Sequence, residues 1–258
     1  MPTISANGET IFYTLEGSGP VVTFIHSLGS SIHMWREQID AFKNRHTVLV
    51  MDCRGHGGSS ANNDVTLEGM ASDLRAVLGH LNISRCHLVG MEMGGSIALL
   101  FNSRWPEVAQ SMVLAAPCLR LQPGSEESVA ATKEAIAYIS MQEFGNQYAA
   151  QRLHPSTSLD VQDELAACVA KVSPKAYYET MASARLTDYA DTLKAVAAPV
   201  LVLVGDEDEF TPMAEAKFIA DGIDGARLEI LPHAGNLSNL DNPSGFNAVV
   251  RHFIEQQS

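Results

Sequence analysis

The chain has 258 residues, 46% hydrophobic and 18% charged, a composition typical of a globular protein. Its 30 acidic side chains against 17 Lys and Arg give a formal net charge of -13, which disfavours nucleic acid and anionic membranes as partners. No apolar run is long enough to span a membrane, and no secretory signal is visible, so we expect a cytoplasmic protein. The four cysteines are widely spaced, which predicts reduced thiols rather than a disulfide framework or a zinc cluster.

Short apolar, β-branched runs alternate with helix-like stretches along most of the chain. The expected strands are 21–26, 47–52, 87–90, 111–117, 200–205 and 226–231. The expected helices are 34–42, 66–81, 95–105, 212–222 and 243–256. Runs of this kind are typical of strands buried on both faces, and the alternation predicts an α/β fold with a mostly parallel, doubly wound sheet.

One long stretch interrupts the alternation. Between about residues 119 and 190 the sequence contains several helical patterns and no convincing strand. We therefore predict a single core built from residues 1–118 and 190–258, with residues 119–189 inserted as a helical cap.

The segment HLVGMEMGGSIALLF, residues 87–101, has the form of a strand, a tight turn and an apolar helix. A residue on such a turn is pushed out above the sheet, and its neighbours must be small. Gly90, Gly94 and Gly95 supply that room, and Glu92 is the residue at the turn. The helix N-terminus favours negative charge there, by roughly 0.3–1 kcal/mol for an exposed group.

Five motifs occur in a characteristic order. They are HSLGSS (26–31), DCRGHGGS (52–59), GMEMGG (90–95), GDEDEFTP (205–212) and HAGNLSNLDNP (233–243). Over almost its whole length the chain thereby resembles the α/β-hydrolase superfamily, in particular enol-lactonase, carboxylesterase and haloperoxidase-like members. The resemblance implies the α/β-hydrolase fold, with ligands bound at the carboxyl ends of the strands beneath the cap. It also implies that the backbone N–H groups of Leu28 and Met93 form an oxyanion hole.

The chain departs from the superfamily pattern at both positions that transfer protons. Glu92 stands where the resemblance places the serine nucleophile, and Asn236 where it places the histidine, whereas the acid position retains Asp208. Ordinary serine hydrolysis is therefore excluded at this site. We favour Glu92 as a general base on a small carbonyl or lactone-type metabolite, with the hole stabilising an enolate oxygen. Asn236 would donate a hydrogen bond or orient the base, and Asp208 would accept from its amide. The reaction class would be isomerisation, lyase cleavage, decarboxylation or cyclisation.

Two other interpretations remain open. Glu92 could be a carboxylate nucleophile towards a lactone, ester, epoxide or halide, as an aspartate is in related dehalogenases and epoxide hydrolases. Asn236 cannot take a proton from water, however, so an ester on Glu92 would tend to persist. Alternatively, the protein is an inactive ligand-binding or sensor protein of the same fold. A charged residue at a buried position is costly, which favours an enzyme.

The remaining candidates concern the substrate. Arg120 would bind an acidic substrate, and the other possible substrate-binding residues are Ser27, Trp105, Met141 and His233. No metal-ligand spacing, dinucleotide fingerprint or phosphate loop is present, so we expect no metal and no cofactor. The expected partner is a small molecule, and the sequence makes no prediction of oligomeric state.

Overall fold

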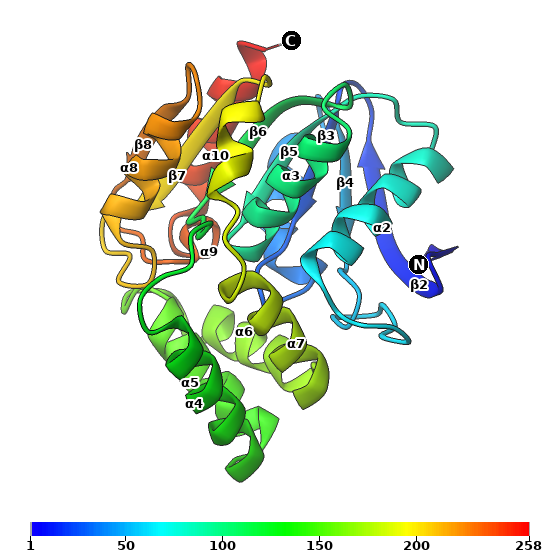
Figure 1. Cartoon of the computed structure of the whole chain (residues 1–258). Helices are drawn as coiled ribbons and strands as arrows, with labels where there is room; N and C mark the ends of the chain where they lie inside the picture. Colours follow the sequence, from blue (N-terminus) through cyan, green and yellow to red (C-terminus); the bar gives the residue numbers. More distant parts are fainter. Residues whose placement is uncertain (1, 258) are drawn as a thin grey trace.

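The computed structural model describes residues 2–257, and its centre is one eight-stranded sheet (Figure 1). The strand order is β1-β2-β4-β3-β5-β6-β7-β8. The strands are β1 (Thr3–Ala6), β2 (Glu9–Gly17), β3 (Val21–Ile25), β4 (Thr47–Met51), β5 (Cys86–Met91), β6 (Ala109–Ala115), β7 (Val200–Gly205) and β8 (Arg227–Leu231). From β4 to β8 all neighbours are parallel, while β1 and β2 pair antiparallel at one edge. The prediction of a mostly parallel α/β sheet is confirmed, and the two N-terminal strands were not predicted.

Helices cover both faces of the sheet. In Figure 1, α2, α3 and α8 lie in front of it and α10 lies behind. The helices that belong to this layered part are η1 (Ile32–Trp35), α1 (Arg36–Phe42), α2 (Leu67–His80), α3 (Met93–Arg104), η2 (Ala190–Ala195), α8 (Met213–Gly222), α9 (Ser238–Asp241) and α10 (Pro243–Glu255). The central strands are accordingly buried on both faces; every residue of β5 and β7 is buried.

Four further helices lie between β6 and β7. They are α4 (Ser125–Tyr138), α5 (Met141–Arg152), α6 (Leu159–Lys171) and α7 (Pro174–Arg185). Ser140 caps α5 by accepting the N–H of Glu143, and Ser173 caps α7, with Pro174 as its first residue. α5 packs against α6 and α4 against α7, and the group lies at one end of the sheet (Figure 1). These helices occupy the segment for which we predicted a cap; its exact limits at 119 and 189 stay a prediction.

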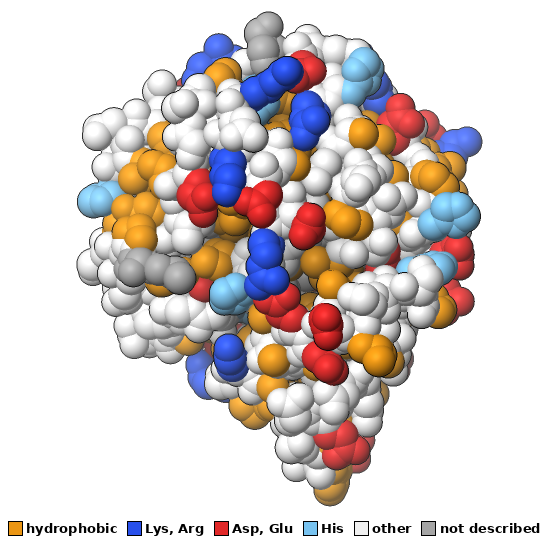
Figure 2. All heavy atoms as spheres, turned by 180° about the vertical axis from the view of Figure 1, so that it is seen from behind, with side chains coloured by type: hydrophobic (Ala, Val, Ile, Leu, Met, Phe, Trp, Pro, Cys, Tyr) orange, Lys and Arg blue, Asp and Glu red, His pale blue; other side chains and the backbone are white. Residues whose placement is uncertain are grey.

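No helix among residues 2–257 is long and apolar enough to cross a membrane. Figure 2 shows the face behind that of Figure 1, where Lys and Arg side chains are interspersed with Asp and Glu. That face therefore carries no continuous basic surface of the kind that binds nucleic acid.

Candidate active site

Glu92 occupies the sharp turn between β5 and α3. Its backbone has φ 50° and ψ -108°, and its N–H donates to the carbonyl of Ala115 at 2.7 Å. The glycines around it are required by close backbone contacts: a Cβ on Gly90 would lie 2.2 Å from the backbone of Gly94. A Cβ on Gly94 would lie 2.1 Å from the carbonyl oxygen of Ile25. The turn thus holds an acidic residue above the sheet in a strained conformation, with 7% of its surface exposed.

One carboxylate oxygen of Glu92 is held by the backbone. Its Oε2 accepts the N–H of Leu28 at 3.0 Å, from the loop after β3. Met93 is the first residue of α3, so its N–H has no acceptor within the helix. The Leu28 donor, which the resemblance assigned to an oxyanion hole, therefore binds the protein's own carboxylate in this structure.

The other oxygen of Glu92 faces two arginines. Its Oε1 lies 3.9 Å from Nη1 of Arg152, at the end of α5, and 3.8 Å from Nη2 of Arg185, at the end of α7. Both separations exceed hydrogen-bond length. Within residues 2–257, Oε1 receives no hydrogen bond, although two cations lie close to it.

Asn236 and Asp208 form a chain that leads to the same cluster. Nδ2 of Asn236 donates to both carboxylate oxygens of Asp208, at 3.2 and 3.1 Å. Its Oδ1 accepts Nη1 of Arg152 at 2.9 Å. Asp208 also accepts the backbone N–H groups of Phe210 and Thr211. Both ends of the Asn236 amide are thus engaged, and it links Asp208 to the guanidinium that faces Glu92.

Arg152 is buried within an aromatic and acidic surrounding. Its guanidinium lies 4.0 Å from the ring centre of Phe210 and 5.1 Å from that of Tyr148. Burial acts to lower the pKa of Arg152, but Tyr148, Glu92 and other neighbours outweigh it and the pKa is raised. Burial also raises the pKa of Tyr148 to about 12, so its hydroxyl stays protonated and donates to the carbonyl of Leu28 at 2.8 Å. The cluster therefore combines permanent cations with neutral donors.

A cavity of about 360 Å³ opens beside the two arginines. Its wall is formed by α4, α5 and α7, together with Phe210 from the loop after β7. The lining residues are Ser128, Ala131, Thr132, Ala135, Phe144, Gln147, Tyr148, Gln151, Arg152, Tyr177, Met181, Arg185 and Phe210. This volume falls in the range of small-molecule sites. Arg152, Gln151 and Phe210 also line a second, more polar cavity of about 660 Å³, on whose wall Asp208 and Asn236 lie.

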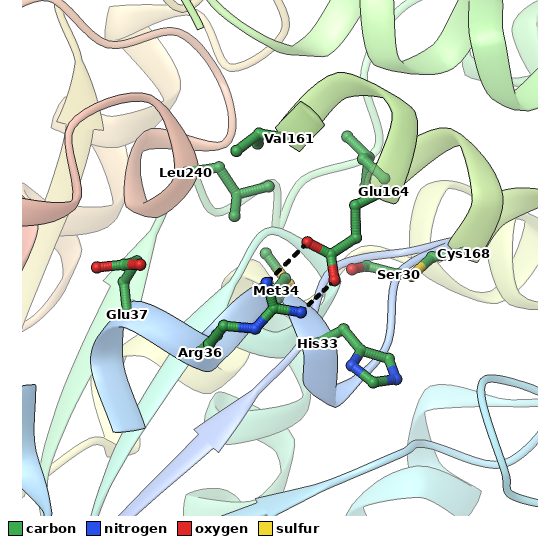
Figure 3. Close-up of a pocket in the computed structure, with 10 residues that line it drawn as sticks. Ser30, His33, Met34, Arg36, Glu37, Val161, Glu164, Cys168 and Leu240 are labelled. Atoms are coloured by element: carbon green, nitrogen blue, oxygen red, sulfur yellow. Dashed lines mark hydrogen bonds and ion pairs between the residues drawn. The ribbon is translucent and has the colours of Figure 1, made fainter. Parts of the chain in front are cut away.

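A third, much smaller cavity of about 70 Å³ lies between α6 and the segment formed by η1 and α1 (Figure 3). Arg36 and Glu164 form an ion pair across it, with Nη2 and Oε1 2.5 Å apart. Its wall also includes Val161, Leu240 and Cys168. The cavity is too small for a metabolite and holds no group aimed at Glu92, so we do not assign the reaction to it.

Several of the predicted substrate-binding residues lie outside the large cavities. Arg120 pairs with Glu215 of α8, with Nη2 and Oε2 2.6 Å apart, so it does not face Glu92. Trp105 lies just beyond α3, about 18 Å along the helix from the turn, where it packs on Phe101. Each side chain is engaged elsewhere in this structure, and substrate binding by either one stays a prediction.

The other three predicted substrate-binding residues are His233, Met141 and Ser27. His233 is exposed on the loop after β8. Met141 is the half-buried first residue of α5 and is absent from the cavity wall that Phe144 and Tyr148 of the same helix form. Ser27 is fully buried and its hydroxyl contacts the sulfur of Met34. None of the three lines the cavity of about 360 Å³ or the cavity of about 660 Å³.

Sequence reasoning missed Arg152 and Arg185, the two cations nearest to Glu92. Both lie in the helical insertion, 60 and 93 positions from Glu92 in the numbering. Each is the last residue of its helix, where a basic side chain is favourable for the helix itself. Their positions therefore had an ordinary local explanation, and no sequence signal distinguished them.

Comparisons with known proteins agree with this architecture. The model of the alpha/beta hydrolase fold family matches residues 20–243, so the chain belongs to that family. It is similar to 3-oxoadipate enol-lactonase 2 of Acinetobacter baylyi, with 26% identity over 98% of this chain and 96% of that protein. Among solved structures, an enol-lactonase from Burkholderia xenovorans superposes with a TM-score of 0.92 at 22% identity, covering 98% of this chain and all of the other. A hydrolase from Pseudomonas aeruginosa does so with a TM-score of 0.89 at 28% identity, covering 98% and 97%.

Proposed function

We propose that the protein is an enzyme that uses Glu92 as a general base on a small carbonyl or lactone-type metabolite. The observation that carries the proposal is the asymmetry of the carboxylate. Oε2 is anchored on the N–H of Leu28, whereas Oε1 lacks a hydrogen-bond donor among the described residues and faces two guanidinium groups, on a side chain that is 9% exposed. Removal of a proton next to a carbonyl requires an oriented group that accepts the proton and fixed positive charge that stabilises the resulting enolate.

The proposed step transfers one proton from the substrate to Glu92 and leaves the total charge of the protein and substrate together unchanged. Oε1 of Glu92 takes a proton from the carbon next to the carbonyl, and the electrons of that C–H bond form the enolate. The negative charge thereby moves from the carboxylate to the substrate oxygen. Because Arg152 and Arg185 both lie within 4 Å of Oε1, the enolate stays close to two cations. Because the Leu28 N–H keeps Glu92 oriented, we assign stabilisation of the enolate oxygen to the two arginines rather than to the backbone oxyanion hole.

Return of the proton to another carbon would complete an isomerisation, and loss of a leaving group would complete a lyase reaction. Asn236 holds Arg152 in place by accepting from its Nη1, and Asp208 in turn holds Asn236. Neither of these residues needs to exchange a proton. The proposal therefore explains why a site without a histidine retains the Asp208 position.

Proton removal is tested by hydrogen–deuterium exchange. A panel of small ketones, oxo acids and lactones is incubated in D₂O, and exchange next to the carbonyl is followed by NMR. We expect exchange with the wild type, a loss of at least about a hundredfold in Glu92→Gln, and no change in the matched control Glu215→Gln, an acidic residue paired with Arg120. Exchange by Glu92→Gln at the wild-type rate would refute the proposal.

The second candidate is covalent hydrolysis, which the names of the lactonase and hydrolase relatives favour. In that case Oε1 attacks the substrate. At the alkyl carbon of an epoxide or halide, the C–O or C–halogen bond breaks and an ester forms on Glu92. At the carbonyl carbon of a lactone or ester, the C–O bond to the alkoxide breaks and a mixed anhydride forms. Asn236 cannot activate water because its amide is bound at both ends. Intact-protein mass spectrometry after exposure to lactones or esters would reveal the adduct. Asn236→His should then speed its release, and Glu92→Ser combined with Asn236→His should restore ordinary esterase chemistry.

An inactive binding protein is the third possibility. Under that interpretation a ligand of the cavity binds without exchange, adduct or turnover, whether residue 92 is Glu or Gln. Finding such a ligand and none of these reactions would therefore replace the enzymatic proposal.

A further inference from the structure

The cavity beside Glu92 has an unusual charge for this protein. The chain carries a formal net charge of -13, yet the 13 residues that line the cavity include two arginines and no Asp, Glu, Lys or His. Glu92 is not among the lining residues, but its Oε1 lies within 4 Å of a guanidinium nitrogen of each arginine. A ligand entering between α4, α5 and α7 therefore meets positive charge first.

The two arginines differ in how much of their hydrogen-bonding capacity is used. Arg152 donates to Asn236 and stacks on Phe210. Arg185 makes no hydrogen bond with any described residue, and its one ion pair is the 3.8 Å approach to Glu92. Its side chain is 21% exposed and lies in the cavity wall. A guanidinium carries five N–H donors in a fork that matches a carboxylate, so Arg185, although close to Glu92, has donors available for a ligand in the cavity.

We propose that Arg185 is the binding residue for a carboxylate on the substrate, so that the protein acts on a small carbonyl or lactone-type acid rather than a neutral compound. The inference rests on the proposed function and names its substrate class. In this proposal the carboxylate takes the unused N–H donors of Arg185 on the cavity side, while the carbonyl end extends towards Oε1 of Glu92, 3.8 Å from Nη2 of Arg185. The volume of about 360 Å³ suits a compound with few carbon atoms.

The apolar and aromatic wall completes the site. Tyr177 and Phe144 pack edge to face with ring centres 5.0 Å apart, and Met181 lies one turn before Arg185 on α7. These side chains contact the carbon chain of a ligand but cannot neutralise its charge. Burial holds the pKa of Tyr177 well above its usual value, so this hydroxyl stays neutral. Arg185 is thus the cation of this cavity that is available for an acid.

The experiment measures binding of pyruvate, 2-oxobutanoate and 4-oxopentanoate, each compared with an uncharged ketone of similar length, by NMR titration at low salt. We expect the acids to bind wild type better than the ketones, and to bind Arg185→Gln at least about tenfold more weakly. Lys175→Gln, an exposed cation on the same helix, is the matched control and should bind like wild type. Glu92→Gln should bind the acids more tightly, because it removes the carboxylate that repels them.

Two results overturn the inference: none of the acids binds the wild type, or Arg185→Gln binds them as the wild type does. Circular dichroism of each variant shows whether it is folded, and Arg185→Lys provides a second variant that keeps the charge but loses the fork. Arg185→Lys should bind with intermediate affinity. Failure of the proposed function is distinguishable, because acids would still bind through Arg185 while Glu92→Gln left the exchange rate unchanged.

Discussion

Glu92 and Arg185 should be energetically coupled, although no hydrogen bond joins them. At the observed 3.8 Å, two unit charges attract by about 1 kcal/mol in water and by about 4 kcal/mol at an effective dielectric constant near 20. The Arg185 side chain is 21% exposed, so solvent screens the pair and the lower half of that range applies. We therefore predict a coupling free energy of about 1–2 kcal/mol between the two side chains.

A double-mutant cycle measures this quantity. Urea denaturation of the wild type, Glu92→Gln, Arg185→Gln and the double variant gives the four free energies of unfolding. The cycle with Lys175→Gln in place of Arg185→Gln is the control, and its coupling should stay below about 0.3 kcal/mol. If the two cycles give the same value, the carboxylate at the turn is not paired with the helical insertion, and the electrostatic basis of the proposed site fails.

Three further predictions concern the scaffold. Asp73→Asn removes the carboxylate that Arg54 binds with two contacts of 2.7 Å, both side chains being buried, and should lower the free energy of unfolding by about 3–5 kcal/mol in urea denaturation. Gly94→Ala places a Cβ 2.1 Å from a carbonyl oxygen and should lower the free energy of unfolding by more than about 2 kcal/mol. Gly95→Ala, whose nearest contact is 3.5 Å, should melt near the wild-type temperature. Equal melting temperatures of the two variants would contradict the geometry. Burial lowers the pKa of His56 from 6.5 to about 3, so the folded state keeps this ring neutral. Its contribution is fully present above about pH 6.5 and is lost as the pH falls towards 3, by about 1.4 kcal/mol per unit, and His56→Gln should flatten that part of the stability profile.

The parts of the fold that could be predicted are those with a local signal. The five central strands, β3 to β7, are apolar because helices cover both their faces, and the sequence shows them as continuous apolar runs. β2, in contrast, alternates buried and exposed residues and contains Glu9, Thr10 and Thr14, so it lacks that signal. It forms because it pairs with β4, a contact that no local pattern encodes.

The candidate site likewise contains features with a local sequence signal and features that depend on tertiary packing. The turn at Glu92 and the Asn236–Asp208 contact follow from motifs whose backbone geometry is local to the ends of β5, β7 and β8, and the structure contains that contact. The positions of Arg152 and Arg185 depend instead on how α4 to α7 pack together, which no motif specifies. The glutamate's hydrogen bond to the N–H of Leu28 was also not foreseen, because it depends on a side-chain conformation rather than on spacing.

The charges grouped around Glu92 are better explained by a chemical role than by stability. A buried pair of unlike charges is weak support for stability, since apolar side chains of similar volume often serve as well or better. Here two arginines of the helical insertion face Glu92, and one of them is tied through Asn236 to Asp208. Stability alone does not call for this arrangement, whereas proton removal beside fixed cations does. Under the proposed function, substrate binding and the base become interdependent, because an acid held by Arg185 would compete with Glu92 for the same positive charge. Glu92→Gln should therefore separate substrate binding from proton removal: the variant should bind oxo acids more tightly and catalyse hydrogen–deuterium exchange more slowly. Weaker acid binding in this variant would show that the carboxylate assists the ligand instead of competing with it.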